Sequence, residues 1–453
     1  MGGMTAASDS AVALDSLPPR INTPRQVLFA SLIGTTIEFF DFYIYATAAV
    51  LVFPALFFPA SDPASARLAS LATFAIAFIA RPIGSALFGH FGDRVGRKTT
   101  LVLALLTMGL STVTIGALPT YKTIGLAAPV LLAVCRFGQG IGLGGEWGGA
   151  VLLAIENAPA GKRAWYGMFP QLGAPAGFFV SGGVFLALSH WTTNEQFFRW
   201  AWRLPFLASA VLVGVGLYVR LTITETPVFR ESAARRAAAR GSGVRGSGVH
   251  GSTVHVPMVQ VLTRHPRALV AGTLGSLSTF LVFYLMSVFA LSWGTSAMGY
   301  GRGTFLLLEL VGTLFFAACI PLAAMLAERR GRKPVMVGIT VLIGLFGFAL
   351  APLFRAGWVG VAVMLAIGNA LMGVTYGPLG TVIGELFPTE VRYTGTSVAF
   401  NSAAILGASM APYVATWLAR THGLESVGWY LTGSAAVTLV GLGMMRFVGD
   451  FGG

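Results

Sequence analysis

Twelve apolar stretches follow one another along the chain, each close to the roughly 20 residues that a helix needs to cross a bilayer. Backbone polar groups inside a bilayer must be paired within the protein, so runs of this length predict α-helices. Only 10% of the residues are charged and 55% are hydrophobic, whereas about a quarter are charged in a soluble domain. An all-α membrane protein is therefore expected, with spans at 27–53, 68–91, 99–118, 125–153, 164–188, 201–221, 267–293, 304–327, 334–353, 358–383, 394–419 and 427–448.

The formal net charge of +13 could suggest a nucleic-acid partner. With the N-terminus inside, however, most of the 30 Lys and Arg residues fall in cytoplasmic segments, as the positive-inside rule expects. The charge describes topology, so no nucleic-acid partner is expected. Both termini are predicted to be cytoplasmic in a multi-pass protein of the cytoplasmic (inner) membrane. Cys135 and Cys319 lie within predicted spans, so neither a disulfide nor a metal site is expected.

Two sequence motifs occur twice. GDRVGRK follows the second span, and AERRGRK follows the eighth at an offset of 235 residues; the pattern E-x-x-P-x-x-x-R follows spans four and ten at an offset of 229. Two motif pairs at nearly the same offset predict two six-helix pseudo-repeats. The basic, Gly/Ser-rich segment between them suits a flexible linker near lipid headgroups, for which a passive tether is a sufficient explanation. The predicted organisation is a tail (1–26), a bundle (27–221), a linker (222–266), a second bundle (267–448) and a short tail (449–453).

The stretch RFGQGIGLGGEWGG contains G-x-G-x-x-G, a dinucleotide-binding pattern when it joins a strand to a helix. Here it lies inside an apolar run, which favours a membrane helix. On a helical projection, one face collects small residues that allow close helix packing, namely Gly138, Gly142, Gly145 and Gly149. The opposite face collects polar residues expected to face the bundle interior, namely Arg136, Gln139 and Glu146.

Ionisable residues inside predicted spans indicate a functional site. Glu38 and Asp41 are three residues apart and share a helical face, and the second span carries Arg81. We expect Glu38 or Asp41 to pair with Arg136. An arginine can hold a carboxylate through two hydrogen bonds, and a carboxylate can load and release a proton, so the set predicts proton-coupled movement of an anionic or zwitterionic solute. A buried ion pair that only holds helices together would use the same residues.

Further polar residues are candidates for the wall of a central cavity, although each could equally form an interhelical hydrogen bond. They are Gln171, Tyr284, Asn369, Tyr376 and Asn401. Glu309, near the external end of the eighth span, is ambiguous between a structural and a functional role.

The sequence also resembles a known family. GHFGDRVGRK resembles the loop signature of the major facilitator superfamily, and IEFFDF, RFGQGIGLGGEWGGAVLLAIE and ELFPTEVRYTGTS are similar to its metabolite:proton symporters. The resemblance implies a twelve-helix fold, uptake by alternating access and the proton gradient as the driving force, without a cofactor. It also implies a cytoplasmic gate, whose candidate residues are Asp93, Arg94, Arg97, Glu156, Arg163, Glu328, Arg332, Glu385 and Arg392.

Other functions remain open at this point. A proton-coupled exporter on the same fold is the main alternative, and Gly173, Pro175 and Gly177 resemble an exporter signature only loosely. A membrane-bound enzyme or a transporter-like sensor is remote, because the sequence contains no H-E-x-x-H, G-x-S-x-G or P-loop. Thr35 and Phe39 depart from residues that are common in the symporter family. The expected partners are a small carboxylate or zwitterionic metabolite, a proton and membrane lipid, and the expected state is a monomer.

Overall fold

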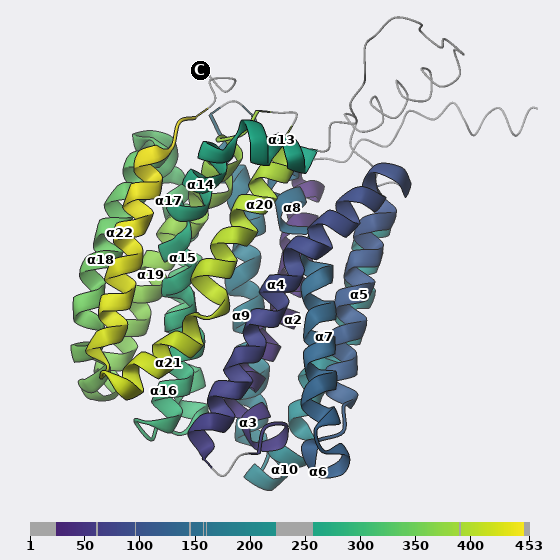
Figure 1. The fold of residues 1–453 in the computed structure, drawn as a ribbon, viewed down its shortest axis with the longest axis vertical. Coiled ribbons are helices and arrows are strands. Elements are labelled where there is room, and N and C mark those ends of the chain that lie inside the picture. The colour runs from purple at the N-terminus through teal and green to yellow at the C-terminus, as the bar shows by residue number, and fades with distance from the viewer. Residues whose placement is uncertain are drawn as a thin grey trace, which may run out of the picture.

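The computed structural model describes residues 24–59, 62–95, 97–144, 146–156, 158–159, 161–222, 257–388 and 391–447, all of which form helices or short connections (Figure 1). The helices of the first half are α2 (Pro24–Leu51), α3 (Phe53–Leu56), α4 (Pro63–Val95), α5 (Arg97–Ala117), α6 (Tyr121–Ile124), α7 (Ala127–Leu143), α8 (Glu146–Glu156), α9 (Arg163–Trp191), α10 (Asn194–Arg199), η1 (Ala201–Arg203) and α11 (Leu204–Thr222). Those of the second half are α13 (Pro257–Arg264), α14 (Pro266–Gly275), α15 (Leu277–Tyr284), η2 (Leu285–Phe289), α16 (Ala290–Ser296), α17 (Arg302–Arg330), α18 (Arg332–Arg355), α19 (Gly357–Gly384), α20 (Arg392–Ala404), η3 (Ile405–Ser409), α21 (Ala411–Thr421) and α22 (Glu425–Met444).

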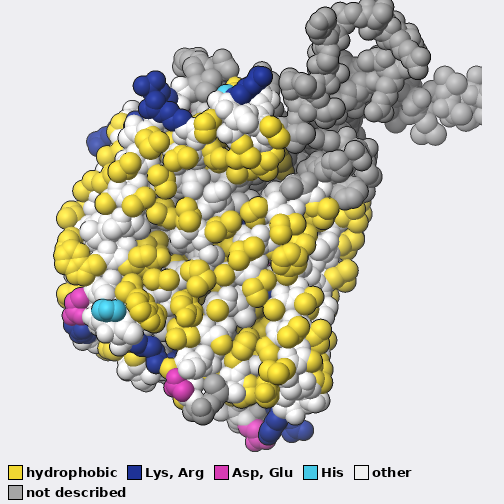
Figure 2. Space-filling view, viewed as in Figure 1, with side chains coloured by type: hydrophobic (Ala, Val, Ile, Leu, Met, Phe, Trp, Pro, Cys, Tyr) yellow, Lys and Arg dark blue, Asp and Glu magenta, His cyan; other side chains and the backbone are white. Residues whose placement is uncertain are grey.

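The prediction of an all-α membrane fold is confirmed, because a helix or a run of helices occupies every one of the twelve predicted spans. Eleven stretches of the described chain are long and apolar enough to cross a membrane, and the remaining span contains the shorter apolar helix Val102–Ala117. Figure 2 shows the matching surface: a broad hydrophobic band covers the middle of the molecule, while Lys, Arg, Asp and Glu gather at its two ends. Such a surface fits a hydrocarbon core between two polar interfaces.

Two spans are interrupted within the described residues. The seventh consists of α14, α15, η2 and α16, and the eleventh of α20, η3 and α21. In the fourth span, α7 and α8 lie on either side of residue 145, which is outside the described residues. The segments η2 and η3 are π-helical, a rare geometry that often occurs at functional sites. Irregular backbone at membrane depth is tolerated where it is buried in the protein, and most of these segments' residues are buried.

The glycines of the fourth span allow close packing, as predicted, but they contact more than one neighbour. Gly138 and Gly142 face α5; a Cβ atom at Gly142 would lie 2.7 Å from the carbonyl oxygen of Ala104. Gly149 instead faces α20, where a Cβ atom on this glycine would lie 3.4 Å from Tyr393 Cε2. Gly145 lies outside the described residues. The predicted glycine face therefore packs against α5 at Gly138 and Gly142 and against α20 at Gly149.

Contacts between the two halves follow a few long helices. Helix α9 packs along α2 of its own half and along α17 of the other half, and α4 contacts α20 and α21. Helix α13 lies across one end of the bundle, the same end at which the last helix, α22, finishes (Figure 1). The region enclosed by α2, α4, α7, α8, α15, α19 and α20 contains the candidate site.

Candidate functional site

A small cavity lies between the two halves at the centre of the bundle. Its charged wall residues are Glu38 of α2 and Arg81 of α4, and both belong to the first half. The neutral polar wall residues are Tyr43, Tyr284, Tyr376, Ser397 and Asn401, and the aromatic ones include Trp147, Phe280, Phe283 and Phe400. The cavity has a free volume of about 30 Å³, room for roughly one or two water molecules. This closed form is therefore too tight for an organic solute.

Glu38 and Arg81 are both almost completely buried, with exposed fractions of 4% and 8%. The positive charges of Arg81 and Arg220 act on Glu38, although no ion pair within 4.0 Å joins Glu38 to a cation in the described part of the chain. The Arg81 guanidinium lies over the rings of Phe42 and Phe78, at 5.0 and 4.7 Å. An acid and a fixed positive charge thus face one cavity.

Arg136 does not form the predicted pair with Glu38 or Asp41. Its guanidinium is fully buried over three aromatic rings, those of Tyr45 at 3.9 Å, Phe42 at 4.5 Å and Phe74 at 4.9 Å. Its Nη1 atom donates to Gln139 Oε1 at 3.0 Å, and Gln139 Nε2 donates to Thr112 Oγ1 at 2.8 Å. Neither Arg136 nor Gln139 belongs to the cavity wall. Cation–π contacts replace the carboxylate that the sequence suggested.

Asp41 also lies away from the cavity, although it shares a helix with Glu38. Its carboxylate is fully buried and accepts a hydrogen bond from Ser209 Oγ of α11 at 2.5 Å. Residues three apart on a helix lie about 60° apart around its axis, which is enough here to direct one carboxylate to the cavity and the other to α11. The two acids therefore belong to different environments.

Glu146 forms an ion pair with Arg220, near the end of α11. The side chains are 6% and 14% exposed. The positive charge of Arg220 also acts on Glu38. This one guanidinium therefore interacts with both the cavity carboxylate and Glu146. Arg220 was not among the site residues predicted from the sequence, although it lies within the sixth predicted span. A search for basic residues on the spans beside Glu146 would have found it.

Gln171 of α9 joins α8 to α19 beside the cavity through two hydrogen bonds. Its Oε1 atom accepts a hydrogen bond from Trp147 Nε1 at 2.9 Å, and its Nε2 atom donates to the carbonyl oxygen of Tyr376 at 2.9 Å. Trp147 in turn stacks on Phe400 of the second half, with ring centroids 3.5 Å apart. Trp147 and Phe400 are wall residues that the sequence analysis missed, because aromatic residues are common in every membrane span.

The candidates from the second half divide into two groups. The structure places Tyr284, Tyr376 and Asn401 on the cavity wall. Asn369 is absent from that wall; its Nδ2 atom donates to the carbonyl oxygen of Leu365 at 2.9 Å, within its own helix.

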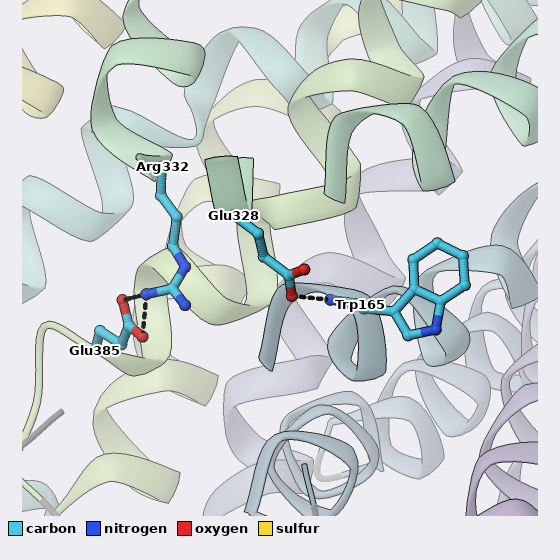
Figure 3. A network of polar contacts seen from close by, with 4 residues as sticks. All are labelled: Trp165, Glu328, Arg332 and Glu385. Atoms are coloured by element: carbon cyan, nitrogen blue, oxygen red, sulfur yellow. Dashed lines mark hydrogen bonds and ion pairs between the residues drawn. The ribbon is translucent and has the colours of Figure 1, made fainter. Parts of the chain in front are cut away.

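Several predicted gate residues meet at the end of the bundle that carries α13. Glu328 accepts a hydrogen bond from the backbone nitrogen of Trp165 at 2.9 Å, which joins α17 to the first turn of α9, and Arg332 pairs with Glu385 (Figure 3). Carboxylates are favourable at such helix N-termini, where backbone N–H groups lack partners. Burial raises the pKa of Glu385, and the charge of Arg332 opposes that rise.

Arg163, Glu385 and Arg392 line a second cavity at the same end, together with Thr381. Its free volume is about 180 Å³. The remaining gate candidates, Asp93, Arg94, Arg97 and Glu156, have side chains outside the described part of the chain, so their role stays a prediction.

The opposite end of the bundle has a contact between the halves that the sequence did not suggest. Arg302, at the start of α17, donates from Nε to Ser189 Oγ at 2.8 Å and from Nη2 to Asn194 Oδ1 at 3.3 Å. Its guanidinium also lies 3.7 Å from the ring centroid of Phe197. Helices α9 and α17 are thus joined by polar contacts near both of their ends.

Comparisons with known proteins agree with this architecture. The model of the sugar (and other) transporter family matches residues 27–447. The chain is 55% identical over 428 residues to the inner membrane metabolite transport protein YhjE of Escherichia coli (strain K12), with 93% of this chain and 94% of that protein covered. It is 36% identical over 408 residues to the shikimate transporter of the same organism, with 88% of each covered.

Among solved structures, the chain is similar in fold to the xylose transporter XylE from E. coli in a partially occluded inward open conformation. The TM-score is 0.71 at 18% identity, with 92% of this chain and 96% of that one covered. The similarity extends over nearly the whole of both chains.

Proposed function

The chain belongs to the sugar (and other) transporter family of the major facilitator superfamily, and from that premise we propose that it is a proton-coupled symporter that imports a small organic acid or a zwitterionic metabolite. It is a multi-pass membrane transporter of metabolites rather than an enzyme. The observation that carries the proposal is the central cavity, where a buried carboxyl group and a buried guanidinium face neutral polar groups of the other half.

Arg81 is the residue suited to hold the solute. A guanidinium keeps its charge under all relevant conditions and matches a carboxylate with two parallel hydrogen bonds. In the closed form its guanidinium lies over aromatic rings, and within the described residues it forms no ion pair with an acid. A solute carboxylate could therefore pair with it. A carboxylate is also the group that shikimate and zwitterionic amino acids share.

Glu38 is the residue suited to carry the proton. It lies in the same cavity as Arg81, and protonation removes a negative charge that is costly to keep inside a membrane. A solute anion bound at Arg81 favours a proton on the neighbouring Glu38, because two negative charges in one small cavity repel each other. Proton and solute binding are thereby coupled, which is the requirement for symport.

Alternating access requires the cavity to open to one side at a time. In this proposal the halves 27–221 and 267–448 move against each other, connected by the linker 222–266. The contact of Glu328 with Trp165 and the pair of Arg332 with Glu385 close the cytoplasmic end, and the contacts of Arg302 with Ser189 and Asn194 close the external end. Both sets are formed around a cavity too small for solute, as expected of an occluded intermediate.

The proposed setting is the cytoplasmic membrane, with both termini in the cytoplasm and the protein acting as a monomer. The name of the E. coli relative, an inner membrane metabolite transport protein, supports the location. The predicted excess of basic residues on that side supports the orientation.

Transport by the purified protein in liposomes tests the proposal. An inward proton gradient is applied, internal pH is recorded with a trapped dye, and the external solution receives shikimate, α-ketoglutarate, citrate, proline or betaine in turn. We expect one of these solutes to enter together with protons, and a protonophore to abolish its accumulation while leaving exchange intact.

Solute-driven proton movement in the opposite direction to the solute would instead identify a proton-coupled exporter. Liposomes without protein serve as the control for passive leak. Solute uptake that ignores the proton gradient would contradict symport.

A further inference from the structure

Glu309 is a buried acid that the proposed mechanism does not use. It lies on the third turn of α17, and only 4% of its surface is exposed. The exposed stripe of α17, formed by Leu307, Val311, Leu314 and Leu322, would face lipid. Glu309 lies instead on the opposite, buried side of the helix, with Gly312, Thr313 and Phe316. Its position in the interior of the second half is thus fixed by the amphipathic pattern of α17.

The surroundings of Glu309 offer no charge to balance an ionised carboxylate. Its Oε1 atom has no hydrogen-bond partner in the described part of the chain, and no ion pair within 4.0 Å involves it there. An acid in such a position must be neutral or gain a cation, because an unpaired charge inside a membrane is costly.

The helices packed against α17 carry few ionisable residues that could pair with Glu309. They are α9, α16, α18 and α19. Apart from Tyr376 of α19, their ionisable residues lie toward the helix ends and comprise Arg163, Tyr166, His190, Arg332, Lys333 and Arg355. On α17 itself, Arg302 lies about 10 Å along the helix axis from Glu309 and engages Ser189 and Asn194.

Helix α19 contacts both the part of α17 that carries Glu309 and the central cavity. Thr313, one turn further along α17, is 1% exposed and donates from Oγ1 to the carbonyl oxygen of Glu309 at 2.8 Å. A Cβ atom on Gly312 would lie 3.0 Å from Asn369 Nδ2 of α19, and Tyr376, two turns along α19, belongs to the cavity wall.

The π-helical segment η2 packs against the same level of α19. A Cβ atom on Gly368, the neighbour of Asn369, would contact the side chain of Met286 in η2. π-Helical turns are rare in proteins overall, and those that occur are often at functional sites. The π-helical segment η2 beside Asn369 is therefore a second, independent indication of function.

We propose that Glu309 is a second proton-binding carboxyl group of this transporter, located toward the external end of the second half and separate from Glu38. The external assignment rests on the membrane orientation given under the proposed function. Glu309 would take a proton near the external surface, and α19, which packs against α17 and carries Tyr376 of the cavity wall, would couple its state to the cavity. The ligand is a proton alone, and no bond other than the carboxyl O–H is formed or broken.

Infrared difference spectroscopy of the reconstituted protein tests this without any solute. Spectra are recorded between acidic and alkaline pH for the wild type, Glu309→Gln, Glu38→Gln and the double variant. We expect the wild type to lose a protonated-carboxyl C=O band at alkaline pH, and Glu309→Gln to lack that band. Glu195→Gln, which removes an exposed glutamate, is the matched control and should retain it. The double variant should bind one proton fewer than Glu38→Gln.

Two results would overturn the proposal. Identical spectra of the wild type and Glu309→Gln would show that Glu309 binds no proton, and a Glu309 band that persists at alkaline pH would show that the proton is never released. If Glu309→Gln does not fold, Glu309→Asp takes its place, and an unshifted band in that variant would equally contradict the assignment. Since no solute is present, failure of solute-coupled transport in the wild type would refute the proposed function separately.

Discussion

The two halves of the molecule contribute different chemistry to the same cavity. The first half supplies the charged wall residues Glu38 and Arg81, whereas the second half supplies hydroxyl and amide groups, on Tyr284, Tyr376 and Asn401 among others. The repeat offset of 229 residues places Leu365 at the position of Arg136 and Thr375 at that of Glu146. The two halves thus share a helical arrangement, but these two charges of the first half have no charged counterpart in the second.

The difference suggests a division of labour. Buried charges are costly, and they are stable only where the surrounding packing holds them in place. In the first half, aromatic rings and glutamine hold Arg136, and Arg220 holds Glu146. The second half can move against this fixed set without separating buried ion pairs, because its wall groups are neutral. Variants that remove charge from the cavity wall of the first half should therefore affect coupling more than variants of the neutral wall groups in the second.

Removal of the acid in the first half should have the largest effect. Glu38→Gln cannot bind a proton at this position, so uptake should no longer follow the proton gradient. A gradient of about one pH unit supplies about 1.4 kcal/mol per proton, or about tenfold accumulation, and that tenfold should disappear. Exchange of labelled for unlabelled solute across liposomes should continue, because it needs no net proton movement.

Glu195→Gln provides the control for Glu38→Gln, since it also replaces a glutamate with glutamine but at an exposed position. It should accumulate solute as the wild type does. If Glu38→Gln still accumulated solute against its gradient, the proton would have to be carried elsewhere.

The next largest effect is expected from the cation of the cavity. Arg81→Lys keeps the charge but loses the planar fork that binds a carboxylate through two hydrogen bonds. Loss of one charge-assisted hydrogen bond is worth roughly 1.5–3 kcal/mol, so the apparent affinity for solute should fall by roughly 10- to 100-fold. Solute titration of transport rates in liposomes measures this change.

Arg136→Lys is the matched comparison for Arg81→Lys. Because Arg136 lies over three rings and is absent from the cavity wall, its replacement should cost folding stability of about 1–2 kcal/mol and change solute affinity less than Arg81→Lys does. A larger loss of affinity at Arg136 than at Arg81 would reverse the assignment and favour a state in which Phe42 moves away from Arg136.

The sequence predicted the helices of this fold better than it predicted the contacts between them. Twelve spans and the close packing of Gly138 and Gly142 follow from apolar length and residue size, which are local properties. The partner of Arg136 does not, because a long side chain can reach several helices and the rotation of each helix about its axis is set by tertiary packing. Helical spacing grouped Glu38 with Asp41, yet only Glu38 reaches the cavity.

Aromatic partners were missed for a related reason. Phenylalanine and tyrosine occur throughout the spans, so nothing local marks Phe42, Tyr45 and Phe74 as the surroundings of a guanidinium. Arg220 was missed because a basic residue near the end of a span is ordinarily a topology signal. Its pairing with Glu146 depends on the depth at which α8 and α11 meet, and that depth is a property of the assembled bundle.

Replacement of a neutral wall group of the second half should have the smallest effect. Tyr284→Phe removes one hydroxyl group from the cavity wall and leaves the ring packed against Phe74 and Phe78, whose centroids lie 6.0 and 5.8 Å away. A neutral hydrogen bond is worth about 0.5–1.5 kcal/mol, so solute affinity should fall by about 2- to 10-fold, with the number of protons per solute unchanged. Tyr218→Phe, at a side chain that is 70% exposed, is the control and should behave as the wild type. A change in the proton-to-solute ratio of Tyr284→Phe would mean that the neutral wall groups of the second half take part in coupling as well as in binding, and the division between a charged and a neutral cavity wall would then fail.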